Sequence, residues 1–254
     1  MPYRYDLHCH TKEGSKCSDI AATDMAELYY EMGYTGFCIT DHFSGMTTLP
    51  DDTSWRERVL FHYDIYEKAR AAGEKYGLTV FWGIEYSPVY DIKQMSNCIW
   101  IDFVVFNLSK EWLIENQSAF CGTDKEQLSN LRKAGGFISH AHPIIYKQDT
   151  EQIQLYQNYV DAVEVINGGL SDIDNNAAQQ YARAYGLYET AATDIHRYDQ
   201  RVMAGLETET HNDTIDSLIS AIKMQRTKPF SIDRDVNKYW LQIQQGASEA
   251  RKLV

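Results

Sequence analysis

The sequence predicts an α/β barrel. Stretches typical of β-strands alternate with stretches of helical periodicity over most of the chain, an order that favours parallel strands joined by right-handed helical crossovers. An open wound sheet has the same alternation, but a second observation favours the closed form. Histidines and carboxylates end the first, second, third, fifth and seventh predicted strands, and only a ring of strands brings all of those carboxyl ends to one rim.

The first half of the chain contains four predicted strands, at residues 3–10, 36–40, 78–86 and 99–106. The first helix begins at Thr23, a suitable N-cap, and ends at Gly33. Ser54 and Glu57 form a capping box for a second helix, which ends before Gly77.

The second half contains three predicted strands, at residues 137–142, 160–166 and 188–193. Thr123 and Glu126 form another capping box, and the helix that follows ends at Gly135. Further helices are predicted at residues 150–158, 175–185 and 214–224. Because no linker, repeat or low-complexity segment divides the chain, we expect a single domain over residues 1–254.

The composition excludes several classes of function. Lys and Arg number 24 against 36 Asp and Glu, a formal net charge of −12, so a grip on a long nucleic-acid backbone is not expected. Bound cations would still let the protein take a small anion, a nucleotide or a short oligonucleotide end. No apolar run of about 18 residues would span a membrane. The N-terminus has no signal-peptide core, and five cysteines without a Cys-x-x-Cys pair suit the cytoplasm, which is the expected location.

Paired histidines indicate a metal site. His8 and His10 lie near the end of the first predicted strand, where residues i and i+2 share a face, so their imidazoles form a chelate for a divalent transition metal. One such pair is weak on its own, but the spacing recurs twice and two further candidates close short apolar runs. These recurring residues are His42, Glu85, His140, His142, Asp194 and His196. The alternative is that they are polar strand ends without a ligand, and for Glu85 a buried ion pair with an arginine.

Taken in order, these motifs resemble those of the PHP family (polymerase and histidinol phosphatase). The matching motifs are His8-x-His10-Thr11, Thr40-Asp41-His42, Gly83-Ile84-Glu85, His142-Pro143 and Asp194-x-His196, with Val163-Glu164-Val165 and Asn167 resembling the sixth strand. The resemblance covers residues 3–230. It implies a distorted (β/α)7, TIM-like barrel with two or three divalent metal ions (Zn, Mn or Fe) at the carboxyl-terminal rim. Family members hydrolyse phosphate esters with a metal-bridging hydroxide.

The resemblance also implies a set of ligands for each metal. A first metal would be held by His8, His10, Glu85 and Asp194, a second by Glu85 and His142, and a third by His42 and His196. The chain departs from the family pattern in two places. Asn107 stands where many members have a histidine on the fourth strand. The loop at residues 12–19 offers Glu13, Cys17, Asp19 or no side chain at all as the further ligand of the third metal.

Other side chains would support the site. Asp41 is expected to orient an imidazole through its second ring nitrogen. His140 shares a strand face with His142 and is a candidate for an orienting group or for the proton donor to the leaving group. Arg197 is a candidate phosphate clamp, with Lys12, Lys16 and Lys147 as alternatives.

These expectations define three functional hypotheses. The first is a metal-dependent phosphomonoesterase for a small substrate such as a nucleoside monophosphate, a phosphorylated metabolite or a histidinol-phosphate-like compound. The second is hydrolysis of a phosphodiester, such as a cyclic phosphate or an oligonucleotide end. The third is a metal-stabilised barrel without catalysis that serves as a regulatory or binding domain.

Overall fold

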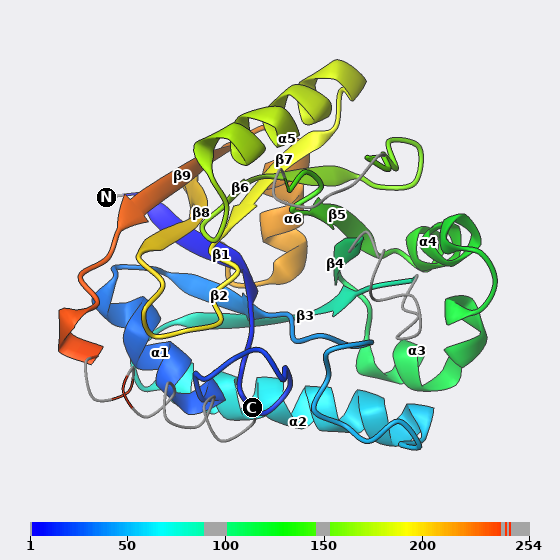
Figure 1. Ribbon diagram of the computed structural model, residues 1–254, viewed down its shortest axis with the longest axis horizontal. Coiled ribbons are helices and arrows are strands. Elements are labelled where there is room, and N and C mark those ends of the chain that lie inside the picture. Colours follow the sequence, from blue (N-terminus) through cyan, green and yellow to red (C-terminus); the bar gives the residue numbers. More distant parts are fainter. Residues whose placement is uncertain (1, 89–100, 146–152, 240–241, 243, 245–254) are drawn as a thin grey trace.

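The computed structural model describes residues 2–88, 101–145, 153–239, 242 and 244, and forms a nearly closed, barrel-shaped sheet with helices around it (Figure 1). Its nine strands lie in the order β7-β6-β5-β4-β3-β2-β1-β8-β9. The strands are β1 (Tyr3–Cys9), β2 (Gly36–Ile39), β3 (Thr79–Tyr86), β4 (Asp102–Phe106), β5 (Phe137–Ala141), β6 (Ala162–Asn167), β7 (Tyr188–Ala192), β8 (Val202–Thr208) and β9 (Thr227–Asp233). The α-helices are α1 (Ala22–Glu31), α2 (Trp55–Glu74), α3 (Lys110–Glu115), α4 (Asp124–Lys133), α5 (Asp172–Tyr185) and α6 (Ile215–Lys223).

The ring closes between β1 and the segment that follows β7. His10 N donates a hydrogen bond to Ile195 O at 3.0 Å, and Asp194 N donates to His8 O at 2.9 Å. These bonds bring the ends of the first and seventh strands together, which confirms the predicted TIM-like barrel. β8 and β9 extend the sheet on the other side of β1, to which β8 is antiparallel.

The predicted parallel pairing is wrong for the fourth strand. β4 runs antiparallel to both β3 and β5. No helix is predicted between residues 86 and 99, and strands that follow one another without a crossover helix commonly pair antiparallel. The reversal places the amino end of β4, rather than its carboxyl end, at the rim where the parallel strands finish.

The sequence patterns miss or misplace several elements. β8 carries Gly205, where a Cβ atom would lie 2.4 Å from Tyr5 O, so close packing against β1 excludes a side chain that would reveal the strand. β9 contains Pro229 and has no fully buried residue, which weakens its strand pattern. The short helix α3 is also missed. Of the helix predicted at residues 150–158, the described residues 153–158 are not helical and the remainder lies outside the described residues.

Two details at helix starts differ from the prediction. α1 begins at Ala22 without a cap from Thr23, and Ala22 N instead donates to the carboxylate of Glu13 at 3.0 Å. α5 begins at Asp172, earlier than predicted, because Ser171 forms its capping box. The capping boxes predicted for α2 and α4 are present. Within the described residues, no helix combines the length and apolar character needed to cross a membrane.

Apolar side chains fill both the barrel interior and the space between sheet and helices. The interior cluster includes Tyr5, Leu7, Phe81, Phe106 and Phe137, all nearly inaccessible to solvent. Because successive strand residues alternate between the two faces, the interior set also identifies which polar residues point toward the helices.

Candidate metal centre

All seven predicted ligands meet at the carboxyl-terminal rim of the parallel strands. Four groups of three side chains place one donor atom of each member within 4.8 Å of the others. The groups are His8, His10 and Glu85; His8, His142 and Asp194; Glu85, Asp102 and His142; and His10, His42 and His196. Neighbouring groups share members, so the donors form one continuous cluster with room for more than one cation.

An irregularity in β1 turns two imidazoles toward the cluster. Tyr5 and Leu7 face the barrel interior, whereas Cys9 packs in the cluster beneath α1 and α2. The register of β1 against β2 shifts between Asp6 and Cys9, which changes the phase of the strand. His8 and His10 therefore lie on the inner side at the rim, where their Nε2 atoms are 3.0 Å apart.

Hydrogen bonds at the second ring nitrogen fix the tautomers of three histidines. His8 Nδ1 lies 3.0 Å from a Glu164 carboxylate oxygen, and His196 Nδ1 lies 2.9 Å from Asp194 O, so both nitrogens must donate. His10 Nδ1 lies 3.0 Å from Ser15 Oγ. The Ser15 hydroxyl gives its only hydrogen to Asp41 at 2.7 Å, so His10 Nδ1 must also donate.

Each of these rings, when neutral, then presents a bare Nε2 lone pair to the cluster. The His8 and His10 Nε2 atoms lie 3.0 Å apart, a contact that needs a proton or a cation between the two lone pairs. Donation from Nδ1 to an oxygen is the arrangement that orients histidine ligands of metals. The arrangement of tautomers therefore fits bound divalent cations.

The buried carboxylates fit cations as well. Glu85 Oε2 and Asp194 Oδ1 are buried and accept no hydrogen bond, although His42 Nδ1 lies 2.5 Å from the first and His10 Nε2 lies 3.2 Å from the second. Burial raises the pKa of Glu85, but the charges of His42, His8 and His10 outweigh it and hold the pKa well below its usual range. A buried, ionised carboxylate needs a cationic partner; protonated imidazoles supply it in the metal-free protein, and a bound cation would replace them.

Asp102 is a candidate ligand that the sequence patterns missed. It begins β4, and the antiparallel direction of that strand brings it opposite Ala141 and beside His142 and Glu85. Burial, followed by the charge of Glu85, raises its pKa. Asn107, at the other end of β4, donates to Gly135 O at the amino end of β5, so it lies away from the cluster. Asn107, expected at the fourth-strand ligand position, therefore does not lie at the rim, whereas Asp102 lies there with His142 and Glu85.

Glu164 and Asn167 form hydrogen bonds with several of the candidate ligands. Glu164 Oε1 accepts from His8, while Oε2 accepts from His142 N at 3.0 Å and from Asn167 Nδ2 at 2.9 Å. Asn167 Nδ2 also lies 3.1 Å from Asp194 Oδ2. The predicted orienting role of Asp41 has a matching path, because Asp41 reaches His10 through Ser15.

His140 lies on the other side of the sheet from the cluster. Phe137 and Ala141 of β5 face the interior, so His140 faces the helices, where its ring packs against Phe103, Tyr156 and Tyr181. Burial lowers its pKa to about 3, so the ring is neutral. This placement does not support the predicted role as proton donor. His142 escapes the same alternation because its backbone turns at φ 29°.

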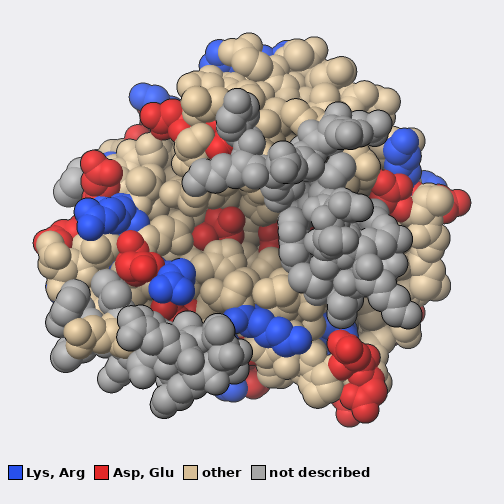
Figure 2. All heavy atoms as spheres, viewed as in Figure 1, with Lys and Arg blue, Asp and Glu red and all other residues tan. Residues whose placement is uncertain are grey.

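Three of the four predicted phosphate clamps lie among the described residues, and all three are exposed. Arg197 follows His196, is exposed and pairs with Asp199 at 3.0 Å. Lys12 and Lys16 are exposed on the loop after β1, and Lys147 lies outside the described residues. Figure 2 shows that the viewed face is hollowed near its centre, with acidic side chains inside the hollow and basic side chains at its border.

The three candidates for a further ligand in the loop at residues 12–19 have different surroundings. Glu13 caps α1, and Asp19 accepts a hydrogen bond from Tyr198 N at 3.2 Å. Cys17 is partly buried: burial alone would raise its pKa, but interactions with His196 and His42 lower it to about 7.

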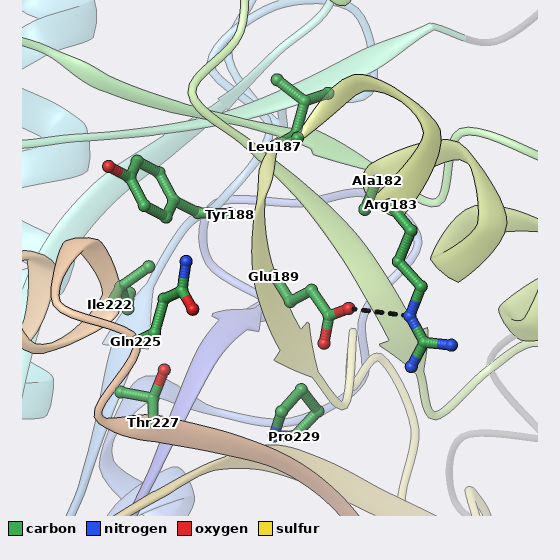
Figure 3. A pocket seen from close by; sticks show the side chains of 10 residues that line it. Ala182, Arg183, Leu187, Tyr188, Glu189, Ile222, Gln225, Thr227 and Pro229 are labelled. Carbon is green, nitrogen blue, oxygen red and sulfur yellow. Dashed lines mark ion pairs between the residues drawn. The ribbon is translucent and has the colours of Figure 1, made fainter.

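A separate cavity of about 380 Å³ lies at the amino end of β7, opposite the ligand cluster (Figure 3). Arg183 and Glu189 line it and point toward one another, with Nε and Oε1 3.7 Å apart. Because Arg183 and Glu189 pair with each other, neither charge is free to bind a ligand, and the ligand cluster remains the better candidate for the functional site.

Comparison with known proteins identifies the fold. No family model and no curated protein sequence matches the chain. Among solved structures, a two-domain protein from Bacteroides vulgatus that contains a PHP-like metal-dependent phosphoesterase is similar with a TM-score of 0.66 and 16% identity, covering 91% of this chain and 65% of that one. A protein from Bifidobacterium adolescentis assigned as a metal-dependent phosphoesterase matches with a TM-score of 0.50 and 14% identity over 76% of this chain and 87% of that one.

An amidohydrolase from Chromobacterium violaceum, solved with bound sulfate and no metal, matches with a TM-score of 0.52 and 13% identity over 76% of this chain and 87% of that one. The chain thus has the barrel fold of PHP-like phosphoesterases and amidohydrolases. The resemblance predicted from the motifs is confirmed at the level of the fold. The chain spans 65% of the length of the Bacteroides vulgatus protein.

Proposed function

We propose that the protein is a metal-dependent hydrolase that cleaves a small phosphomonoester at the rim cluster. The observation that carries the proposal is the convergence of histidine nitrogens and carboxylate oxygens in four overlapping groups, within each of which the donor atoms lie within 4.8 Å of one another. Such a donor set suits zinc, manganese or iron. Two or three bound cations would lower the pKa of a water molecule and offset the charge that develops on phosphoryl oxygens.

The side chains of the cluster divide into three roles in this proposal. His8, His10, Glu85 and Asp194 would hold the central cation, with Glu85 also reaching a second position formed by Asp102 and His142. His42 and His196, with His10, would hold a third. Glu164, Asn167 and the Ser15–Asp41 pair would keep the imidazoles in the required tautomers. Arg197 would need to leave Asp199 to bind a phosphate oxygen.

The charge distribution favours a small anion over a long polyanion. The chain has a formal net charge of −12, so attraction to a phosphate group depends on the cations and on the few basic side chains near the rim. A phosphomonoester carries its charge at one end, which matches a single compact cluster. A polynucleotide would also meet the acidic surface.

The experiment is a chelation and reconstitution assay on the full chain. Metal-free protein should release no phosphate from a panel of nucleoside monophosphates and sugar, alcohol and amino-alcohol phosphates, and Mn²⁺, Zn²⁺ or Fe²⁺ should restore release. His8→Ala should abolish activity, whereas His211→Ala, in a loop away from the cluster, should not. Matched bis-esters separate monoesterase from diesterase activity. Metal-loaded protein that hydrolyses no phosphate ester would exclude the proposed reaction.

A further inference from the structure

The turn after β7 carries two candidate ligands close together in the chain. Asp194 leaves the strand with φ 53°, and His196 lies two residues further on. Because residues other than glycine seldom adopt positive φ, such a turn keeps its shape only where its surroundings hold it. The ring of His196 belongs to the same turn, since its Nδ1 donates to Asp194 O at 2.9 Å. The placement of both side chains therefore depends on what holds this turn.

The side chain of Gln200 closes the turn. Its Nε2 donates to Thr193 O at 2.7 Å, at the residue before Asp194, and its Oε1 accepts from His196 N at 3.2 Å. The backbone of Gln200 adds a third bond, from its N to Arg197 O at 3.3 Å. One amide group thus joins the two ends of the segment that carries the candidate ligands. It needs both a donor and an acceptor to do so, and among neutral side chains of this length only glutamine supplies both.

Neighbouring loops pack against the same turn. A Cβ atom at Gly168, after β6, would lie only 3.0 Å from Thr193 O, so that loop approaches the turn too closely to carry a side chain there. The carbonyl oxygen of His196 accepts from Ser18 Oγ at 3.0 Å. The backbone N–H of His196 is bonded by Gln200 and its C=O by Ser18, which fixes the residue on both sides of its Cα atom.

We propose that Gln200 is a positioning residue of the metal centre, which holds the His196 ring so that Nε2 faces the position shared with His10 and His42. The nitrogens of these three histidines lie within 4.8 Å of one another, and Nδ1 of His196 is already bonded to Asp194 O. Because both polar atoms of its side chain bond to the backbone, Gln200 acts through His196 rather than as a ligand. The inference rests on the proposed function only in requiring that the cluster binds divalent cations.

The test measures Co²⁺ binding to metal-free, full-length protein, by competition with a chelator and by the visible absorption of bound cobalt, which depends on its coordination geometry. Methionine has a similar length but neither polar atom, so Gln200→Met removes both side-chain bonds. We expect this variant to bind one Co²⁺ roughly 10- to 100-fold more weakly than wild type. Gln179→Met, at a partly exposed position on α5, is the matched control and should bind cobalt as wild type does.

A second variant covers the case in which Gln200→Met does not fold. Gln200→Glu keeps the shape of the side chain and the acceptor for His196 N, but its carboxylate cannot donate to Thr193 O and repels it. We expect a smaller loss of Co²⁺ affinity than in Gln200→Met, in the same direction. Unfolding by urea in chelator identifies which variants are folded, and binding is measured only where the chain is folded.

A double-mutant cycle separates positioning from a general loosening of the fold. His196→Ala removes the ring that Gln200 is proposed to hold. In that background Gln200→Met should change the affinity for the remaining Co²⁺ by less than about twofold, because no imidazole is left to position. A residue that merely stabilised the barrel would weaken binding equally in both backgrounds.

Two results would overturn the inference: a folded variant at Gln200 with wild-type Co²⁺ affinity, or a loss of affinity that is equally large in the His196→Ala background. The readout needs no turnover, so it separates this inference from the proposed function. A loss that requires His196 supports the positioning role even if no phosphate ester is hydrolysed. Metal-dependent phosphatase activity together with wild-type Co²⁺ affinity in Gln200→Met would overturn the positioning role and leave the proposed function standing.

Discussion

Glu164→Gln should weaken metal binding without removing any ligand. The Glu164 carboxylate accepts from His8 Nδ1 on one oxygen and from His142 N and Asn167 Nδ2 on the other. Glutamine has the same shape but only one acceptor oxygen, so in either orientation its NH₂ group faces a donor. Asn167 cannot simply flip, because its Oδ1 accepts from Gly169 N at 2.8 Å.

The magnitude follows from the bonds lost. Each hydrogen bond to a charged acceptor is worth about 1.5–3 kcal/mol. Loss of a carboxylate that orients a histidine ligand lowers metal affinity by roughly 10- to 100-fold, or about 1.4–2.7 kcal/mol. We therefore expect the Glu164→Gln variant to bind its tightest Zn²⁺ or Mn²⁺ ion roughly 10 to 100 times more weakly than wild type does.

The assay is competition with a chelator of known affinity at constant pH. Glu189→Gln is the matched control, because Glu189 lies at the opposite end of β7 and faces Arg183 (Figure 3). It should bind metal as wild type does. Unchanged affinity in a cooperatively folded Glu164→Gln variant would refute the orienting role of this carboxylate.

Three further predictions concern titration, stoichiometry and the outlying histidine. Burial lowers the pKa of His142 and His196, but neighbouring carboxylates, Glu85 and Asp194 foremost, raise it to about 9 in the metal-free protein. Their folded pKa exceeds the unfolded value of about 6.5, so this stabilisation, up to about 3 kcal/mol for each imidazole, is complete below pH 6.5 and is lost as the pH rises through 9. Thermal unfolding should therefore show stability falling with pH in chelator but rising with pH in saturating metal, where protons compete with cations; parallel slopes would contradict this. Asp102→Asn should lower the metal content measured by elemental analysis, whereas Asn107→Ala should leave it unchanged, and equal effects would contradict the assignment at β4. His140→Phe should keep full metal content, and a loss of metal in a folded variant would place the ring in the cluster after all.

The sequence patterns predicted seven donor positions because each depends only on local information. A polar residue that ends a short apolar strand points to the rim of a parallel barrel whatever the rest of the chain does. Asp102 could not be found this way. It begins its strand, and it reaches the rim only because β4 runs in reverse, which depends on the pairing of distant segments.

The sequence patterns could not place the side chains of His140 and Cys17, for other physical reasons. The i, i+2 rule holds while the backbone stays extended, but β5 ends at Ala141 and the chain turns at His142, so His140 and His142 part. The position of Cys17 is set by hydrogen bonds from its loop to the segments after β1, β2 and β7. None of these partners is adjacent in sequence, and composition alone treats Glu13, Cys17 and Asp19 alike.

Two candidate ligands occupy a backbone conformation that residues other than glycine seldom adopt. His142 has φ 29° and Asp194 has φ 53°. Non-glycine residues in this region cost about 1–3 kcal/mol each and persist where the surroundings hold them. Asp194 N is held by His8 O at 2.9 Å, and His142 N by Glu164 at 3.0 Å.

Strain of this kind at a metal cluster predicts an unusual order of stabilities. In chelator, Asp194→Gly should unfold with a free energy about 1 kcal/mol higher than Asp194→Ala, because glycine accepts positive φ and alanine does not. With metal present, wild type should exceed both variants, because only the aspartate supplies a ligand oxygen. Equal unfolding free energies for the two variants in chelator would mean that the turn after β7 is unstrained. The expected order would instead show that the fold gives up stability at this turn to place the carboxylate among the imidazoles.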